Sequence, residues 1–166
     1  MEEEWRPIQD YPDYSVSNLG RVKSTRGYGG VAERILAVRP NTSGYLQTDI
    51  GRQWKSAPIH KLVATVFVSN TEPTKTIVDH KNGIITDNRA ENLRWTTPME
   101  SSMNQGVRKD NTTGYKGVSL QNGKYKTGIR VNGVHQHLGY YTTPEEAHAV
   151  YIAKAKELHG EYFRDI

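Results

Sequence analysis

Two Asn-Gly pairs, Asn122-Gly123 and Asn132-Gly133, constrain the folding of this chain more than any other feature. Asparagine and glycine accept the positive φ angles of the two-residue turns that connect antiparallel strands. The β-prone runs beside these pairs predict strands near residues 115–120, 124–131 and 134–141. We therefore expect a three-stranded antiparallel sheet in which each strand pairs with the next along the chain.

A helix is predicted directly after this sheet. Residues 143–146 read Thr-Pro-Glu-Glu, which supplies an N-cap, a first-turn proline and the acid of a capping box. Gly160 ends the helix. An amphipathic helix beside a small sheet packs on one sheet face, so the other face stays free for a ligand. The apolar helical face consists of Ala147, Val150, Tyr151, Ala155 and Leu158.

Basic residues mark that free face. By the two-residue period of a strand, Lys124, Lys126 and Arg130 share one side of the middle strand, whereas Ile129 and Val131 share the side that meets the helix. A basic strand face can hold DNA phosphates or reach bases in the major groove, and it can equally be an ordinary solvated face. Between Asn104 and Thr143 one acid, Asp110, stands against six basic residues: Arg108, Lys109, Lys116, Lys124, Lys126 and Arg130.

Residues 112–164 resemble the plant Apetala-two/ethylene-response-factor DNA-binding domain. The resemblance lies in the phrases Gly114-Tyr115-Lys116-Gly117-Val118, Gly123-Lys124-Tyr125, Ile129-Arg130, Leu138-Gly139 and Glu145-Glu146-Ala147. That family reads duplex DNA with its sheet, and the resemblance implies DNA binding here. It does not imply the family's GC-rich preference, because fewer Arg side chains remain to read guanine. The implied contacts are Lys116, Ser119, Lys124, Arg130, His135, His137 and Tyr140, joined by Lys126 and by Arg108 and Lys109 of a basic linker.

The first fifty residues predict a small β-rich module. Strand-like runs lie near residues 14–16, 34–38 and 45–50, and turn formers stand at residues 17–20 and 27–30. With 166 residues and no cysteine, the chain fits a string of small modules that no disulfide braces.

A polar loop enclosed by two strands follows this module. A helix is predicted to open near Pro58, where Leu62, Val63, Val66 and Phe67 make an apolar stripe. Short strands are then expected at residues 76–80 and 93–97, around the loop of residues 81–92. A second helix is expected to start at Pro98.

This central segment closely resembles the HNH nucleases of phage homing endonucleases. The matching phrases are Ile59-His60-Lys61-Leu62-Val63-Ala64, Ile77-Val78-Asp79-His80-Lys81-Asn82-Gly83 and Glu91-Asn92-Leu93-Arg94-Trp95. The phrases Trp5-Arg6-Pro7-Ile8, Tyr14-Ser15-Val16-Ser17-Asn18 and Gly20-Arg21-Val22-Lys23-Ser24 look like the modular domain that precedes this motif in such enzymes.

Together the resemblances imply an α+β protein built from modules around a ββα-metal nuclease core. The implied domains are a nuclease-associated β-rich module (1–50), the HNH nuclease domain (51–106), a basic linker (107–113) and the sheet-plus-helix DNA-binding domain (114–166). The resemblance implies a site-specific homing endonuclease that hydrolyses phosphodiester bonds in duplex DNA.

The HNH resemblance also implies roles for individual residues. His80 would be the general base, Asn92 would orient its imidazole, and Asp79 would ligate one Mg²⁺ or Mn²⁺, a hard cation that prefers oxygen ligands. The family's second metal ligand is an Asn or His, and Ser101 stands at that position. A serine hydroxyl is a poor metal ligand, so we expect impaired metal binding or turnover unless Asn104 or Glu100 substitutes.

Several further expectations complete the sequence prediction. Without cysteine no structural zinc is expected, and His60 at a helix start is expected either to pack in the core or to support the groups of the site. No apolar run is long enough to span a bilayer, so we expect no membrane partner and a cytoplasmic protein. The resemblance to phage homing endonucleases implies that it is phage-encoded and acts in a bacterial host. Monomer and dimer remain open. The alternative to the enzyme is a catalytically inactive regulator that kept the HNH scaffold and binds DNA.

Overall fold

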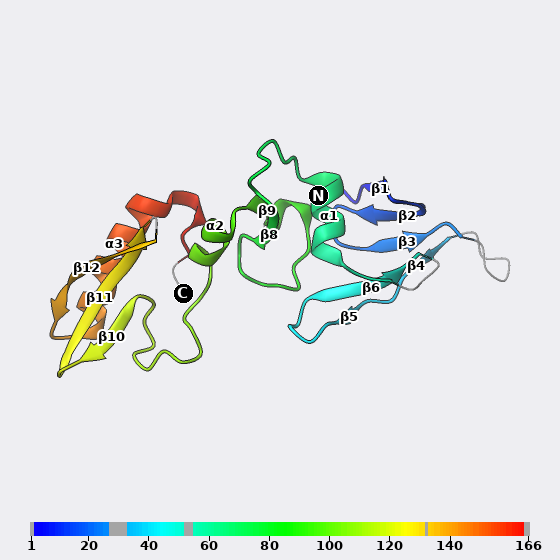
Figure 1. Ribbon diagram of the computed structural model, residues 1–166. Helices are drawn as coiled ribbons and strands as arrows, with labels where there is room; N and C mark the ends of the chain where they lie inside the picture. Colours follow the sequence, from blue (N-terminus) through cyan, green and yellow to red (C-terminus); the bar gives the residue numbers. More distant parts are fainter. Residues whose placement is uncertain (1, 27–32, 52–54, 132, 165–166) are drawn as a thin grey trace. The chain divides into compact units, whose positions relative to one another are not determined.

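The computed structural model describes residues 2–26, 33–51, 55–131 and 133–164 (Figure 1). The chain divides into two compact units, residues 1–98 and 99–166. Both mix short strands with few helices, and every sheet in the described residues is antiparallel, so the predicted α+β class is confirmed. No helix of the described residues is long and apolar enough to cross a membrane.

The first unit begins with two small sheets. The first has the order β1-β2-β3-β4 and the second the order β5-β6-β7. The predicted run at 14–16 lies within β2, and the run at 45–50 forms β6 except for its first residue. The turn at 17–20 is closed by a hydrogen bond from Ser17 N to Arg21 O at 2.8 Å. The predicted turn at 27–30 falls outside the described residues. The strands are β1 (Trp5–Ile8), β2 (Tyr11–Ser17), β3 (Val22–Ser24), β4 (Arg34–Ile35), β5 (Arg39–Pro40), β6 (Leu46–Ile50) and β7 (Lys55–Pro58).

The prediction of one strand over residues 34–38 was wrong. β4 ends at Ile35, which pairs with Lys23, and β5 starts at Arg39, which pairs with Gln47 of the other sheet. The chain therefore crosses from one sheet to the other in this run. A continuous β-prone run cannot reveal which sheet each half joins.

Helix α1 (Ile59–Phe67) covers these sheets and the paired strands β8 (Ile77–His80) and β9 (Leu93–Thr96). Val63 and Ala64 of α1 are fully buried, and Leu62, Val66 and Phe67 pack around them, as the apolar stripe predicts. One core joins the residues before and after position 50. Its buried members are Ile8, Tyr14, Val16, Val22, Ile50, Ile59, Val63, Ala64, Val78 and Leu93.

The segment between β8 and β9 is the polar loop that the sequence predicts. It contains a short 3-10 turn, η1 (Ala90–Asn92), directly before β9. Helix α2 (Pro98–Met103) starts at the predicted proline, at the boundary between the two units.

The second unit is the predicted sheet with one helix against it. Its strands are β10 (Val118–Gln121), β11 (Lys124–Val131) and β12 (Val134–Tyr141), in that spatial order, and α3 (Pro144–His159) packs on one face (Figure 1). The capping box is present, because Thr143 accepts from Glu146 N and Glu146 reaches back to Thr143 N. A short 3-10 turn, η2 (Gly160–Tyr162), follows.

The first strand of this sheet starts at Val118, three residues later than the predicted 115. Asn111 organises the preceding turn: its side-chain oxygen accepts from Gly114 N at 2.7 Å, and its amide donates to Tyr115 O at 3.0 Å. Gly117 has a φ of 75°, and a Cβ there would lie 2.2 Å from the Tyr151 ring. The close approach of α3 therefore requires glycine at position 117, and β10 begins at the next residue.

Candidate active site and DNA-binding surface

Asp79 and His80 stand at the end of β8 and face different partners. Asp79 pairs across the sheet with Arg94 of β9, and His80 pairs with Leu93. Arg94 reaches the same oxygen of Asp79 twice, from Nε at 3.0 Å and from Nη2 at 2.9 Å. The two side chains are only 12% and 11% exposed, so this ion pair is shielded from water. Arg94 therefore fixes the direction of the Asp79 carboxylate.

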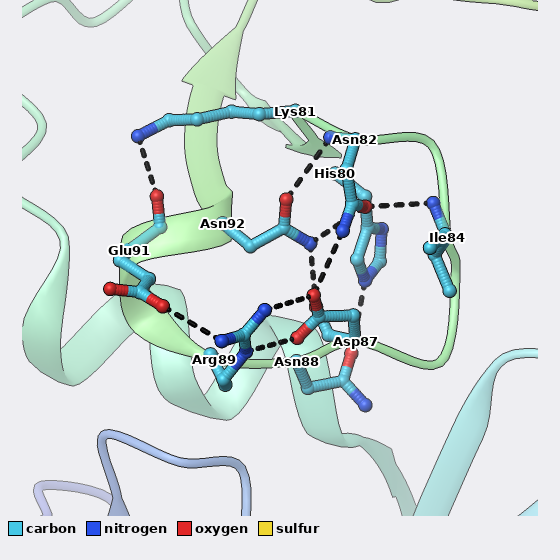
Figure 2. A network of polar contacts seen from close by, with 9 residues as sticks. All are labelled: His80, Lys81, Asn82, Ile84, Asp87, Asn88, Arg89, Glu91 and Asn92. Atoms are coloured by element: carbon cyan, nitrogen blue, oxygen red, sulfur yellow. Dashed lines mark hydrogen bonds and ion pairs between the residues drawn. The ribbon is translucent and has the colours of Figure 1, made fainter. Parts of the chain in front are cut away.

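The imidazole of His80 is held from the loop. Its Nε2 lies 3.0 Å from the side-chain oxygen of Asn88, and the ring is buried (Figure 2). An amide oxygen can only accept, so Nε2 donates in this arrangement and the lone pair of the neutral ring lies on Nδ1. The neutral form of an imidazole can act as a base.

The loop around His80 is a closed network of polar side chains (Figure 2). Asn92 accepts from Asn82 N at 3.0 Å and donates to Asn82 Oδ1 at 3.0 Å and to Asp87 O at 2.8 Å. Asp87 accepts from Asn82 and from Arg89, each at 2.8 Å. The hydrogen bond from Arg89 is the main cause that lowers the pKa of Asp87 to about 2. The network fixes the loop that carries Asn88.

The two asparagines thus have different partners. We expected Asn92 to orient the imidazole, but the contacts of Asn92 described above are to the loop, and the ring is bonded to Asn88. The sequence did not single out Asn88. A polar residue within a loop rich in Asn and Asp carries no pattern that separates it from its neighbours. Its contact with His80 Nε2, which only the fold reveals, makes Asn88 part of the site.

His60 lies against His80. The ring centroids of His60 and His80 are 5.3 Å apart, and Tyr45 lies 5.0 Å from His60 and 6.0 Å from His80. His60 is only 7% exposed, which fits both of its expected roles. Burial lowers the pKa of His60 to about 4, and charge on His80 and on Lys61 acts in the same direction. At neutral pH this ring is therefore uncharged.

The donor set suits a hard divalent cation only in part. Asp79 offers carboxylate oxygens, and Mg²⁺ commonly takes one or two carboxylates and completes its sphere with water and substrate phosphate. Among the described residues, no group of three or more His, Asp or Glu gathers to hold a metal alone. Ser101 and Asn104, the other expected ligand positions, belong to the second unit, where Asn104 is buried and Ser101 is partly exposed.

In the second unit, the expected DNA contacts gather on the sheet face opposite α3. The strand register places Lys126 between Ser119 and Tyr140, Arg130 beside His135, and Gly128 beside His137. Lys124 is exposed at the start of β11. The register therefore brings seven of the expected residues into one surface, here called the basic sheet face: Ser119, Lys124, Lys126, Arg130, His135, His137 and Tyr140.

A groove of about 760 Å³ runs along this face. Lys126, His135 and Arg108 line it. The His135 ring lies close to Gly128, where an added Cβ would stand 2.5 Å from the ring. The register of β11 and β12 shifts at this point, between Thr127 and Gly128. Arg108 is exposed and pairs with Asp110 at 2.9 Å. Lys109 is exposed as well.

Lys116 is the exception among the expected contacts. Its Nζ donates to Met103 O at 2.7 Å and lies 5.3 Å from the Phe163 ring centroid. Phe163 packs on the core beneath α3, with Ile129 and Tyr151. Lys116 therefore points away from the basic sheet face, and the expectation that it joins this surface was wrong. A family motif predicts the position of a residue in the chain, but here the Lys116 side chain is directed to Met103 and Phe163.

Comparison with known families locates two domains in this chain. Residues 3–51 match the NUMOD4 motif, and residues 58–103 match the HNH endonuclease family. The second match contains β8, β9 and the whole polar loop. Asp79, His80, Asn88 and Asn92 all lie in it.

Curated relatives of this chain are named as endonucleases. Residues of this chain are 42% identical over 101 residues to the uncharacterized HNH endonuclease L247 of Acanthamoeba polyphaga mimivirus, covering 57% of this chain and 23% of that protein. They are 33% identical over 110 residues to the DNA endonuclease I-HmuI of Bacillus phage SP01, covering 63% of this chain and 60% of that protein. The chain thus spans less than two thirds of these relatives.

A solved structure supports the same relationship. The structure described as DNA binding and cleavage by the HNH homing endonuclease I-HmuI matches with a TM-score of 0.54 and 28% identity, over 87% of this chain and 80% of that one. Residues 3–51 and 58–103 of this chain therefore match the NUMOD4 motif and the HNH endonuclease family, and the chain is similar to I-HmuI in sequence and fold.

Proposed function

We propose that this chain, with its NUMOD4 motif and HNH endonuclease domain, is a site-specific homing endonuclease that hydrolyses a phosphodiester of duplex DNA with one Mg²⁺ or Mn²⁺. The observation that carries the proposal is the pairing of His80 with Asn88 beside the Asp79–Arg94 ion pair, inside the HNH segment. These contacts prepare a neutral base next to a carboxylate of fixed direction.

His80 acts as the general base. With Nε2 donating to Asn88, Nδ1 is the atom that takes a proton from water. The water oxygen then attacks phosphorus, and the bond to the leaving sugar oxygen breaks. The buried ring must become accessible when DNA binds, since only 4% of it is exposed in the free chain.

Asp79 is the residue that would hold the cation. A Mg²⁺ or Mn²⁺ ion held by Asp79 would supply positive charge to stabilise the charge that develops on the phosphate and the leaving oxygen. Arg94 keeps the Asp79 carboxylate in place through its two contacts to one oxygen. Asn92 serves by fixing the loop that carries Asn88, through its bonds to Asn82 and Asp87.

The basic sheet face of the second unit would hold the DNA. Lys124, Lys126 and Arg130 supply positive charge along β11, and His135, His137 and Tyr140 add polar and aromatic contacts. Phosphate contacts fix the position of a protein on DNA, and side chains that reach base edges give specificity. The exposed Arg108 and Lys109 of the linker extend the positive surface.

One observation favours a second function. Ser101 stands where the family pattern has an Asn or His ligand, and a hydroxyl is a weak ligand for a divalent cation. A chain of this kind would bind DNA as a regulator without cutting it.

The test compares the wild-type chain with Ser101→Asn on a duplex that this chain selects from a random DNA pool. For the endonuclease, we expect Mg²⁺- or Mn²⁺-dependent cleavage that Ser101→Asn raises at least tenfold, with DNA affinity within twofold. Tight binding without cleavage by both proteins, across several divalent cations, would favour the regulator.

A further inference from the structure

His60 carries a buried nitrogen that none of the described residues satisfies. The side chain lies in the first turn of α1 and is 7% exposed, and its Nδ1 has no hydrogen-bond partner. An unsatisfied buried nitrogen destabilises a fold, and an apolar ring of similar shape would avoid this cost. The presence of histidine at this position points to a use for the nitrogen.

The nitrogen belongs to a ring that is packed directly on the proposed base. The His60 and His80 centroids are 5.3 Å apart, with an interplanar angle of 57°. The Tyr45 ring lies near both, with its centroid 5.0 Å from that of His60 and 6.0 Å from that of His80. The charged form of His60 is disfavoured by burial and by its neighbours, so its pKa lies near 4 and it offers a neutral lone pair.

We propose that His60 is a second catalytic residue, which accepts a hydrogen bond at Nδ1 from the water that His80 deprotonates. This inference rests on the proposed function. A water molecule hydrogen-bonds at about 2.9 Å, so one molecule can reach a nitrogen on each of two rings at this separation.

Each of the two imidazoles interacts with one hydrogen of that water. One O–H points to His80, which takes the proton as the water oxygen bonds to phosphorus and the bond to the leaving sugar oxygen breaks. The other O–H stays bonded to His60 throughout. With both O–H bonds directed at fixed acceptors, the two lone pairs of the water oxygen lie on the side away from the rings, and orientation of this kind is a large part of enzymatic rate enhancement.

The experiment compares two substitutions of His60. His60→Phe keeps a ring of similar shape and removes the nitrogen, whereas His60→Asn places an amide near the position of Nδ1. Thr65→Ala, on the exposed face of the same helix, is the matched control. The single-turnover cleavage rate at saturating DNA and the DNA dissociation constant are measured in the wild-type and the Ser101→Asn background. Urea unfolding of the first unit is followed by tryptophan fluorescence, since Trp5, Trp54 and Trp95 all lie within residues 1–98.

For His60→Phe we expect a cleavage rate reduced 10- to 100-fold, a DNA dissociation constant within twofold, and an unfolding midpoint at least as high as that of the parent. His60→Asn should retain a higher rate than His60→Phe despite a lower midpoint, and Thr65→Ala should leave the rate unchanged.

Two results would overturn the inference alone: cleavage by His60→Phe at the parent rate, or rates of the two variants that simply follow their stabilities. Absence of cleavage by the parent in both backgrounds would instead contradict the endonuclease itself, and the inference with it.

Discussion

Arg94 stands directly across the β8–β9 pair from Asp79, and its Nε and Nη2 both reach one carboxylate oxygen, at 3.0 and 2.9 Å. Loss of one partner of a shielded ion pair leaves the other charge in a poorly hydrated place. We therefore expect Arg94→Met to lower the free energy of unfolding of the first unit by about 3 kcal/mol. Urea unfolding followed by tryptophan fluorescence measures this.

The exposed pair of Arg6 with Glu4 supplies the control. Its side chains are 47% and 55% exposed, and the same substitution at Arg6 should cost less than about 1 kcal/mol of electrostatic stability. Added Mn²⁺ should restore more stability to Arg94→Met than to the wild-type chain, because the cation can neutralise Asp79. Equal losses of unfolding free energy for Arg94→Met and Arg6→Met would show that shielding from water does not strengthen the contribution of the Arg94–Asp79 pair.

Asn88 and Asn92 should separate in a mutational comparison. Asn88→Ala removes the partner of His80 Nε2, so we expect the cleavage rate to fall roughly 10- to 100-fold with little change in DNA affinity. Asn92→Ala breaks contacts to Asn82 and Asp87, and should destabilise the first unit by about 2 kcal/mol. Single-turnover rates and urea unfolding are compared for both. If Asn92→Ala instead lowered the cleavage rate and Asn88→Ala lowered the stability, Asn92 would be the residue that orients the imidazole of His80.

The stability of the first unit should depend on pH through His60. Its pKa is about 4 in the folded chain, against an ordinary 6.5, so the folded state resists a proton that the unfolded chain accepts. Stability is therefore highest above pH 6.5 and falls as the pH drops to 4, by roughly 3 kcal/mol in total. Urea unfolding at a series of pH values measures the slope.

His60→Phe should remove most of this loss, and Thr65→Ala should leave it intact. If the unfolding free energy of His60→Phe falls between pH 6.5 and 4 as steeply as that of the wild-type chain, the burial of His60 does not cause the pH dependence.

Salt dependence distinguishes the residues of the basic sheet face from Lys116. When a substitution removes one side chain that binds a phosphate, the slope of log affinity against log salt falls in magnitude by about 0.9. Lys126→Ala and Arg130→Ala should each show this reduction on duplex DNA. Lys116→Ala should not, because its Nζ is directed to Met103 and Phe163.

Lys154→Ala on α3 is the matched control, since Lys154 pairs with Glu157 on the helix. A larger slope change for Lys116→Ala than for Lys126→Ala would place DNA on a different surface of the second unit.

Local sequence patterns predicted several elements of this structure. The Asn-Gly turns and the Thr143 capping box predict β11, β12 and α3 closely, because hairpin turns and helix caps depend on residues adjacent in sequence. The two strands around the polar loop were also predicted from their β-prone runs. These features need no knowledge of distant contacts.

The rest depends on contacts between distant parts of the chain. Asn88 reaches His80 only because Asn82, Asp87 and Asn92 fold the loop back, and no spacing rule predicts that. His60 of α1 meets His80 of β8 and Tyr45, which lies just before β6, so three separate parts of the chain come together. The split of residues 34–38 between two sheets likewise reflects pairing partners that lie elsewhere in the sequence.

The central claim is that His80 removes the proton from the attacking water. The most direct measurement is the single-turnover cleavage rate of His80→Ala against its parent, in the more active of the wild-type and Ser101→Asn backgrounds, with Mg²⁺ or Mn²⁺ and saturating DNA. We expect the rate to fall at least a hundredfold while the DNA dissociation constant stays within about twofold. Cleavage by His80→Ala at the parent rate would contradict the account.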